Sequence, residues 1–212
     1  DRHLIDFEMV EDKLAWMERG RGAEAKARAA DEPFLNSDAV PIHPLRLCRE
    51  VRDFIDRDAT VIGDGGDIVT FGAGTIRIHY PGHWLDPGRF GCLGVGTGYA
   101  LAAKLARPDK QVLILNGDGS FGLNAMEFDT MVRHKLAIVS VIGNDGAWGQ
   151  VKHPQLARYG TSLGTDLARG IRYDRMVEAL GGHGEFVERP QDIRPALERA
   201  FVGRRVSRDA HV

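Results

Sequence analysis

The ten residues 112–121, VLILNGDGSF, decide the fold expected of this chain. Their apolar beginning is typical of a buried strand, and Gly122–Arg133 beyond them has the pattern of a helix. A second apolar run, Leu136–Ile142, predicts another strand. Strand, helix and strand in this order form a βαβ unit with parallel strands and a right-handed crossover. The sequence therefore predicts an α/β fold, a doubly wound, mostly parallel sheet with helices on both faces.

Segments on either side extend this pattern. Short strands are expected at Ala59–Ile62 and at Glu185–Val187. Helical spacing of apolar residues, with proline or glycine at the boundaries, predicts the helices. These cover Glu8–Ala30, Pro44–Ile55, Tyr99–Ala106, Tyr173–Leu180 and Gln191–Val202.

Composition divides the chain into three parts. Residues 1–38 combine a charged, alanine-rich helix with a stretch of Pro, Asn, Ser and Asp, and we expect the tail of a preceding domain plus a linker. Residues 39–202 carry the α/β pattern and form the main domain. Residues 203–212 are mainly basic and polar and are expected to be an atypical carboxyl-terminal tail. Because the chain starts at Asp1 with neither Met nor a signal peptide, we expect it to begin inside a longer protein.

Charge and cysteine content exclude several classes of partner. The 28 Lys and Arg residues nearly balance 30 Asp and Glu residues, which argues against nucleic acid and anionic membranes as partners. The apolar runs are much shorter than the roughly 20 residues that a membrane helix needs. Cys48 and Cys92 lack the spacing of a disulfide framework or a zinc site, so a cytoplasmic location is expected.

The end of the strand in residues 112–121 predicts a ligand site. In an open parallel sheet, ligands bind at the carboxyl ends of the strands, where glycines allow a phosphate to approach the backbone. Asp118 follows the first strand and Asn144 follows the next, so their side chains should converge. A carboxylate, an amide oxygen and a nearby backbone carbonyl are hard oxygen ligands that suit Mg²⁺.

Gly117-Asp118-Gly119, with Asn144 at the end of the next strand, resembles the binding motif of thiamine-diphosphate enzymes. The motif usually ends in Asn-Asn and here reads Gly143-Asn144. The resemblance implies thiamine diphosphate and Mg²⁺ as cofactors. The alternative is that Gly-Asp-Gly is only a surface turn. By the resemblance, Asp118, Asn144 and the carbonyl of Gly146 hold Mg²⁺, while Gly117 lies at the cofactor and Gly119 and Ser120 donate N–H groups to the diphosphate.

Two glycine-rich segments agree with this resemblance. In Gly91–Gly96, the resemblance implies that Leu93 wedges between the two cofactor rings, with Cys92 and Gly94 beside it; the alternative is an ordinary core leucine. In the loop after the first strand, Gly65 and Gly66 are expected at the diphosphate. Asp64 and Asp67 in that loop could equally be turn residues.

From Pro41 to Phe201 the chain resembles the cofactor-binding (PP) domain of one group of these enzymes. The group contains acetolactate synthase, oxalyl-CoA decarboxylase and 2-hydroxyacyl-CoA lyase, and the likeness is closest to actinobacterial 2-hydroxyacyl-CoA lyases. It implies an enzyme that cleaves or forms a C–C bond next to a carbonyl, with a 2-hydroxyacyl-CoA giving an aldehyde or ketone plus formyl-CoA. The alternatives are an acetolactate synthase-like 2-oxo acid decarboxylase or carboligase, and a non-catalytic thiamine-diphosphate-binding module. Trp148, Gln150 and Val151 are candidates for the substrate pocket, although Trp148 could be a core residue.

The resemblance also implies that one part of the active site is missing from this chain. In the family, the activating glutamate lies on a pyrimidine (PYR) domain of a neighbouring subunit, and nothing here resembles that domain. No catalytic residue is therefore expected in this chain, which should be inactive alone. The PYR domain would come from the same longer protein or a partner chain, within a homodimer or homotetramer.

Overall fold

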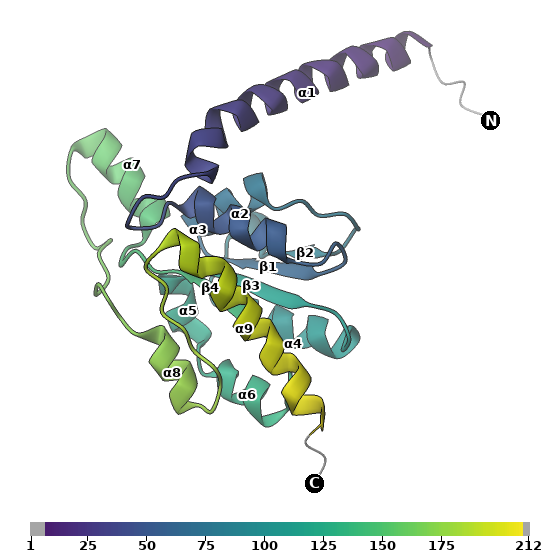
Figure 1. Cartoon of the computed structure of the whole chain (residues 1–212). Helices are drawn as coiled ribbons and strands as arrows, with labels where there is room; N and C mark the ends of the chain where they lie inside the picture. Colours follow the sequence, from purple (N-terminus) through teal and green to yellow (C-terminus); the bar gives the residue numbers. More distant parts are fainter. Residues whose placement is uncertain (1–6, 210–212) are drawn as a thin grey trace.

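The computed structural model describes residues 7–209, with side chains described for residues 12–201. Its centre is a four-stranded parallel sheet in the order β2-β1-β3-β4 (Figure 1). The strands are β1 (Thr60–Asp64), β2 (Trp84–Leu85), β3 (Val112–Gly117) and β4 (Val139–Gly143). In the register, Asp64 pairs with Asn116 and Gly117 pairs with Gly143. The carboxyl ends of β1, β3 and β4 therefore lie at one edge.

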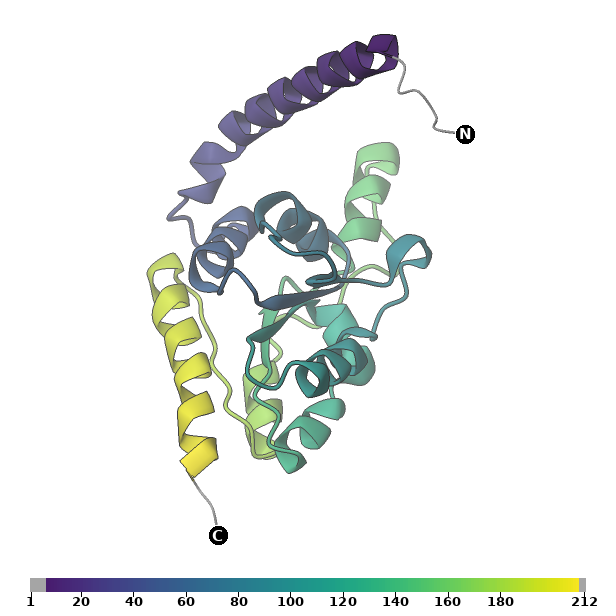
Figure 2. The same ribbon diagram turned by 90° about the vertical axis from the view of Figure 1, so that its right-hand side faces the viewer.

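Helices cover both faces of the sheet, and the predicted doubly wound fold is confirmed (Figures 1 and 2). The first face packs against α2 (Pro44–Phe54), α3 (Asp67–Thr75) and α9 (Pro190–Asp209). The second face packs against α4 (Gly96–Ala106), α5 (Asp118–Asn124), α6 (Glu127–Arg133) and α8 (Tyr173–Ala179). The helix α7 (Gly149–Tyr159) and the short 3₁₀ helix η1 (Gly88–Phe90) lie outside these layers.

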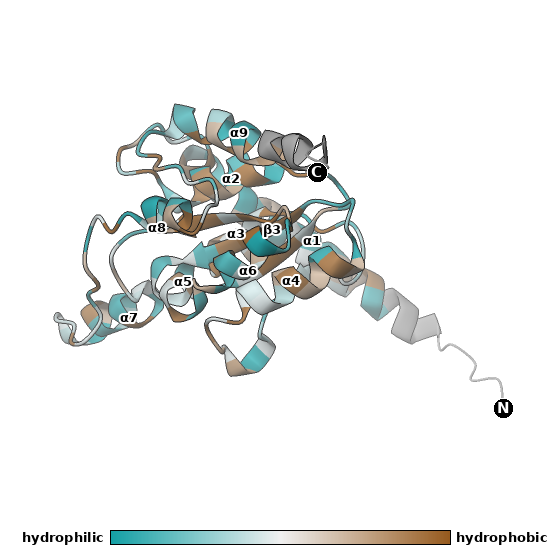
Figure 3. Cartoon of the chain, turned by 90° about the horizontal axis from the view of Figure 1, so that it is seen from below, coloured by the Kyte–Doolittle hydropathy of each residue, from teal (hydrophilic) through white to brown (hydrophobic). Residues whose placement is uncertain are grey.

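Alternation along β3 builds two separate cores. Leu113 and Leu115 point to the first face, and Val112 and Ile114 point to the second, because successive residues of a strand face opposite ways. All four side chains are fully buried, and Figure 3 shows apolar residues gathered on the strands and the inner helix sides. Cys48 of α2 belongs to the first core, where burial raises the pKa of its thiol to about 12.

The long helix α1 (Phe7–Leu35) projects from the domain (Figures 1 and 2). Its carboxyl end meets the domain where the Phe34 ring stacks on His43 at 4.9 Å between ring centroids. Large apolar residues such as Trp16 remain exposed along it. Among the described residues, none of the helices has the length and apolar character needed to cross a membrane.

Several predicted elements differ from the structure. The helix predicted over Gly122–Arg133 is two helices, α5 and α6, and begins at Asp118. The first helix runs to Leu35 instead of Ala30. The last runs past Val202 to Asp209, so the backbone does not break where the 203–212 tail was predicted. Residues 1–6 and 210–212, the outer ends of the predicted terminal parts, lie outside the described residues.

The strand predicted at Glu185–Val187 is wrong for a physical reason. A strand needs backbone partners on a neighbouring strand, and no backbone hydrogen bond joins this segment to β4. Conversely, the sequence analysis missed β2, α3 and α7. The α3 sequence is rich in glycine and β-branched residues, which favour helices weakly, and α7 contains Pro154. Tertiary packing overrides these weak local preferences.

Candidate functional site

Asp118 joins the ends of two strands. It follows β3 directly, and its side chain is buried, with the residue only 3% exposed. Its Oδ2 accepts the N–H of Gly146 at 2.7 Å, and its Oδ1 accepts the N–H of Gly119 at 2.8 Å. Burial raises the pKa of Asp118; these two N–H groups act against the rise, and the nearby charge of Asp145 adds to it. The loop after β4 is thus held against the end of β3.

Asn144 lies in that same loop with its side-chain oxygen available. The residue is exposed, and its Nδ2 donates to the carbonyl of Ile171 at 3.0 Å, which leaves Oδ1 free to face a cation. The carbonyl of Gly146 accepts the N–H of Leu167 at 2.8 Å and keeps a second lone pair. The structure therefore brings the loop of Asn144 and Gly146 onto Asp118.

These oxygen groups fit Mg²⁺ better than a transition metal. No group of three or more His, Cys, Asp or Glu side chains that could hold a metal occurs among the residues described. The set here has one carboxylate, one amide and one carbonyl, and Mg²⁺ is commonly held by one or two carboxylates together with substrate phosphates. The donor set is consistent with an ion shared between protein and a phosphate-bearing ligand.

The ends of β1 and β3 approach closely around Ser120. Its hydroxyl donates to the carbonyl of Asp64 and accepts the N–H of Gly117 at 3.1 Å. A Cβ at Gly65 would lie 2.9 Å from the nitrogen of Gly117, so only glycine fits there. Of the N–H groups expected to face a diphosphate, that of Gly119 is directed to Asp118 instead.

Asp64 positions the loop that contains Gly94 and Gly96. The sequence analysis had left it as a possible turn residue. It is 1% exposed, and its two carboxylate oxygens accept the N–H groups of Gly94 at 2.9 Å and Gly96 at 2.7 Å. The carbonyl of Gly94 in turn accepts Nδ2 of Asn124 at 3.1 Å. The signal was present, because Gly63-Asp64-Gly65 is a second Gly-Asp-Gly at a strand end.

The loop that Asp64 holds presents Leu93 to the site. Leu93 is half-buried and borders a cavity that also reaches Asp118, whereas Cys92 is exposed and does not line this cavity. Leu93 is therefore not an ordinary core leucine.

The start of α7 lies against the glycine residues that follow β1 and β3. A Cβ at Gly119 would lie 2.4 Å from Cζ3 of Trp148, and a Cβ at Gly66 would lie 2.7 Å from Cβ of Gln150. Trp148 is half-buried, so it is not a core residue, and Val151 is 53% exposed. Two of the three expected pocket residues thus contact the glycine loops directly.

A cavity of about 1500 Å³ connects these parts. It is lined by most of the predicted site residues: Gly65, Gly66, Leu93, Gly117, Asp118, Gly119, Ser120, Asn144, Trp148, Gln150 and Val151. Gly94 and Gly146 do not line it, and they contribute through the hydrogen bonds described above. The cavity also continues along β4, away from the strand ends.

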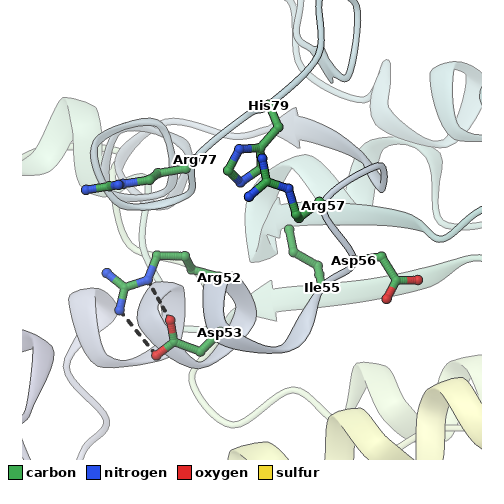
Figure 4. A pocket seen from close by; sticks show the side chains of 7 residues that line it. All are labelled: Arg52, Asp53, Ile55, Asp56, Arg57, Arg77 and His79. Carbon is green, nitrogen blue, oxygen red and sulfur yellow. Dashed lines mark hydrogen bonds and ion pairs between the residues drawn. The ribbon is translucent and has the colours of Figure 1, made fainter.

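A second cavity, of about 430 Å³, is unrelated to this site. It is lined by residues before β1 and after α3, at the amino ends of the strands, so it lies at the opposite edge of the sheet. Figure 4 shows Arg57 and His79 turned toward one another, while Arg52 pairs with Asp53.

Comparisons with known proteins agree with this geometry. Residues 64–208 match the family described as "Thiamine pyrophosphate enzyme, C-terminal TPP binding domain". The chain is 53% identical over 191 residues to an acetolactate synthase large subunit of Mycobacterium tuberculosis, covering 90% of this chain and 35% of that protein. It is 36% identical over 217 residues to 2-hydroxyacyl-CoA lyase 2 of Bos taurus, covering 93% of this chain and 34% of that protein. The chain thus spans about a third of the length of these relatives.

The fold is also similar to that of a solved thiamine diphosphate-dependent enzyme. The thiamine diphosphate-dependent 4-hydroxybenzoylformate decarboxylase of Rhodococcus jostii superposes with a TM-score of 0.72 at 26% sequence identity. The match covers 79% of this chain and 32% of that one.

Proposed function

The chain belongs to the thiamine pyrophosphate enzymes, as their C-terminal TPP-binding domain, and from this we propose that it is the cofactor-binding half of an enzyme acting on C–C bonds next to a carbonyl. Enzymes of this kind use Mg²⁺ together with thiamine diphosphate. The single observation that carries the proposal is the hydrogen bond from Gly146 to the buried Asp118 carboxylate. It supports one shared site at the ends of β3 and β4.

In this proposal, Mg²⁺ is held by the Asp118 carboxylate, Oδ1 of Asn144 and the free lone pair of the Gly146 carbonyl. The diphosphate lies along the glycine loops that follow β1 and β3. Close approach of Gly65 to Gly117 supports this, because it leaves backbone and no side chain at the strand ends. Gly66 and Ser120 would complete the backbone surface, whereas the N–H of Gly119 is bonded to Asp118.

Thiamine diphosphate, when bound, would supply the nucleophilic and electron-accepting chemistry at the carbonyl carbon. The residues of this chain position that chemistry. Asp64 fixes the loop that carries Leu93, whose side chain would sit under the cofactor rings and hold them bent. Trp148, Gln150 and Val151 would shape the substrate space and exclude water.

No residue of this chain is assigned a proton-transfer role. The activating glutamate would be supplied by a PYR domain, from the same longer protein or from a partner chain, within a homodimer or homotetramer. The chain alone would then be inactive.

We propose a 2-hydroxyacyl-CoA as substrate, cleaved to formyl-CoA and an aldehyde or ketone. The several relatives named 2-hydroxyacyl-CoA lyase 2, 35–43% identical, support this. The specific competitor is decarboxylation and condensation of a 2-oxo acid, favoured by the 53% identity to proteins named acetolactate synthase.

The test uses the chain together with its PYR domain, Mg²⁺ and thiamine diphosphate. Release of formyl-CoA from a 2-hydroxyacyl-CoA is expected, whereas acetolactate formation from pyruvate would establish the competitor. Cofactor binding without either product would support a non-catalytic module.

A pair of variants tests the metal site. Asp118→Ala should weaken Mg²⁺-dependent cofactor binding at least tenfold. Asp129→Ala should leave this binding unchanged, because the Asp129 side chain pairs only with a residue of its own helix. Full affinity in Asp118→Ala would refute the site.

A further inference from the structure

The smaller cavity, of about 430 Å³, lies at the amino ends of the strands, on the opposite edge of the sheet from Asp118. Two segments line it. The first is residues 52–57, at the end of α2 and in the turn before β1, and the second is residues 77–79, which follow α3. The volume falls within the roughly 300–1,000 Å³ that is typical of small-molecule pockets. The cavity is therefore large enough for a small ligand.

Three side chains of this cavity carry N–H donors without a partner. Among the residues described, the side chains of Arg57, Arg77 and His79 make no hydrogen bond or ion pair. Figure 4 shows Arg57 and His79 turned toward one another. A guanidinium and an imidazole that face one another offer donors with no acceptor between them, and an anion would supply that acceptor.

The two carboxylates of the cavity do not pair with these side chains. Asp53 is bound to Arg52, whose Nε and Nη2 donate to its two oxygens at 2.7 and 3.2 Å. Asp56 is exposed, and Figure 4 shows its carboxylate directed away from Arg57 and His79. Positive charge thus remains without a direct partner in this cavity, although the whole chain carries a formal net charge of −2.

The fold holds the backbone of both arginine-bearing segments in place. In the turn that carries Arg57, the N–H of Asp56 donates to Oε1 of the buried Gln111 at 2.8 Å. Arg77 directly follows Ile76, which is 5% exposed and belongs to the first core. The two arginines are therefore brought to one cavity by packing and hydrogen bonds elsewhere in the domain.

We propose that this cavity binds a small phosphate monoester. An arginine guanidinium presents its N–H donors in a planar fork that matches the oxygens of a phosphate group. Arg57 and Arg77 offer two such forks from different segments, and His79 can add a further N–H donor. Ile55, which packs against the first core, gives the organic part of the ester an apolar surface.

A small phosphate ester fits this cavity better than other anions. A phosphate monoester carries a charge of about −1.5 to −2 at neutral pH, which matches two arginines, whereas a single carboxylate carries one negative charge. Nucleic acid and anionic membranes are bound by extended basic surfaces, and here the cations line one cavity of a chain with net negative charge. The site is independent of the proposed cofactor site, because it lies at the other edge of the sheet.

The competing role for these cations is to complement helix ends. Each segment follows the carboxyl end of a helix, α2 or α3, where positive charge is favourable. In that role, replacing the arginines would lower stability and leave phosphate binding unchanged. The two roles therefore give different results in the same variants.

The test uses the whole chain, adenosine monophosphate as the phosphate ester and adenosine as its phosphate-free control. Binding is followed by NMR of the histidine imidazole C–H resonances, assigned from His79→Gln and His153→Gln. Adenosine monophosphate should shift the His79 resonances to saturation, and adenosine should not. The His153 resonances should stay in place, because His153 lines the larger cavity at the proposed cofactor site.

Inorganic phosphate separates an ester site from a site for the free ion. It should shift the same His79 resonances but bind more weakly than adenosine monophosphate, because it cannot use the apolar surface of Ile55. Equal affinity for phosphate and the ester, equal binding of adenosine, or a shift of His153 alone would overturn the proposal.

A double variant tests the two arginines. Arg57→Gln combined with Arg77→Gln should weaken binding of adenosine monophosphate by about tenfold or more, because it removes both charged donors. Arg175→Gln is the matched control, since Arg175 is exposed on α8 and lines neither of the two cavities. Unchanged affinity in the double variant, with or without a lower unfolding midpoint, would overturn the proposal. If the double variant fails to fold, the comparison of the three ligands on the unchanged chain decides the question.

Discussion

Asp64 is the last residue of β1 and Asp118 directly follows β3, and each lies within a Gly-Asp-Gly triplet. Both carboxylates are buried, and each accepts two backbone N–H groups. Asp64 uses both bonds to hold one loop, the 91–96 segment, against β1. Asp118 uses one bond on its own helix and one on the loop after β4, at the proposed metal site.

Asp64→Asn should loosen the 91–96 loop, because an amide offers one acceptor oxygen and turns its NH₂ group toward a donor. Hydrogen bonds to charged groups contribute about 1.5–3 kcal/mol, so the free energy of unfolding should fall by about 2 kcal/mol. Thiamine diphosphate affinity in the PYR-containing protein should fall about tenfold, measured by calorimetric titration. Asp86→Asn is the control, since Asp86 also accepts two N–H groups, but at an exposed loop. Unchanged affinity in Asp64→Asn would contradict the positioning role.

Gly119 and Gly122 offer a matched pair on α5. Gly119→Ala would place Cβ 2.4 Å from the Trp148 ring, whereas Gly122→Ala meets nothing within 4 Å. Overpacking of this kind costs about 1–3 kcal/mol, while alanine stabilises a helix interior by about 0.5–1 kcal/mol relative to glycine. Thermal unfolding should therefore shift down for Gly119→Ala and slightly up for Gly122→Ala. Equal shifts would mean that Trp148 does not pack on this helix.

At the scale of elements, an ion pair fixes residues 184–188 to α9. Arg199, and to a lesser degree His183, hold the pKa of Glu185 below its ordinary value of 4.5. A lowered folded-state pKa adds stability that is present above pH 4.5 and is lost as pH falls through the folded-state pKa. Glu185→Gln should therefore lower the unfolding midpoint at pH 7 and have little effect at an acid pH below the folded-state pKa.

The control for this prediction is Asp129→Asn, which removes an exposed pair with Arg133. Exposed pairs of this kind contribute little, so its midpoint should stay near that of the parent chain at both pH values. A pH-independent loss in Glu185→Gln would show that packing, and not the ion pair, holds the segment.

At the scale of the whole molecule, α1 lies apart from both cores. Its carboxyl end contacts α2, and its Phe34 ring stacks on His43, the residue just before that helix. Removal of residues 1–38 should therefore leave the unfolding midpoint within a few degrees of the parent chain, measured by calorimetry. Removal of residues 1–55 should abolish cooperative unfolding, because it deletes Cys48 and Val51, both 0% exposed in the first core. A large loss on removing only 1–38 would refute the predicted domain start at residue 39.

Strong local signals were enough to predict β1, β3 and β4 and the edge of the sheet where their carboxyl ends lie. The apolar runs of β3 and β4 predicted parallel strands, and parallel strands in register bring their carboxyl ends together. The approach of the Asn144 loop to Asp118 follows from that, although the roles of these residues as metal ligands remain a proposal. Weak local signals were not enough to predict α3 and α7. Their residues have low helix propensity, and these helices form because their side chains pack against other parts of the chain. Such packing leaves no pattern in the local sequence.

The doubly wound architecture and the strand ends that carry Asp118 and Asn144 could be predicted from the sequence, because period, turn residues and spacing act over short distances along the chain. The cofactor class followed from the resemblance of these motifs to those of thiamine-diphosphate enzymes. Three features could be seen only in the folded chain: Asp64 holds the Leu93 loop, Trp148 packs on Gly119, and Glu185–Val187 makes no backbone hydrogen bond to β4. Each of these depends on whether a segment distant in sequence supplies a hydrogen-bond partner or a contact surface, and that is settled by packing in three dimensions.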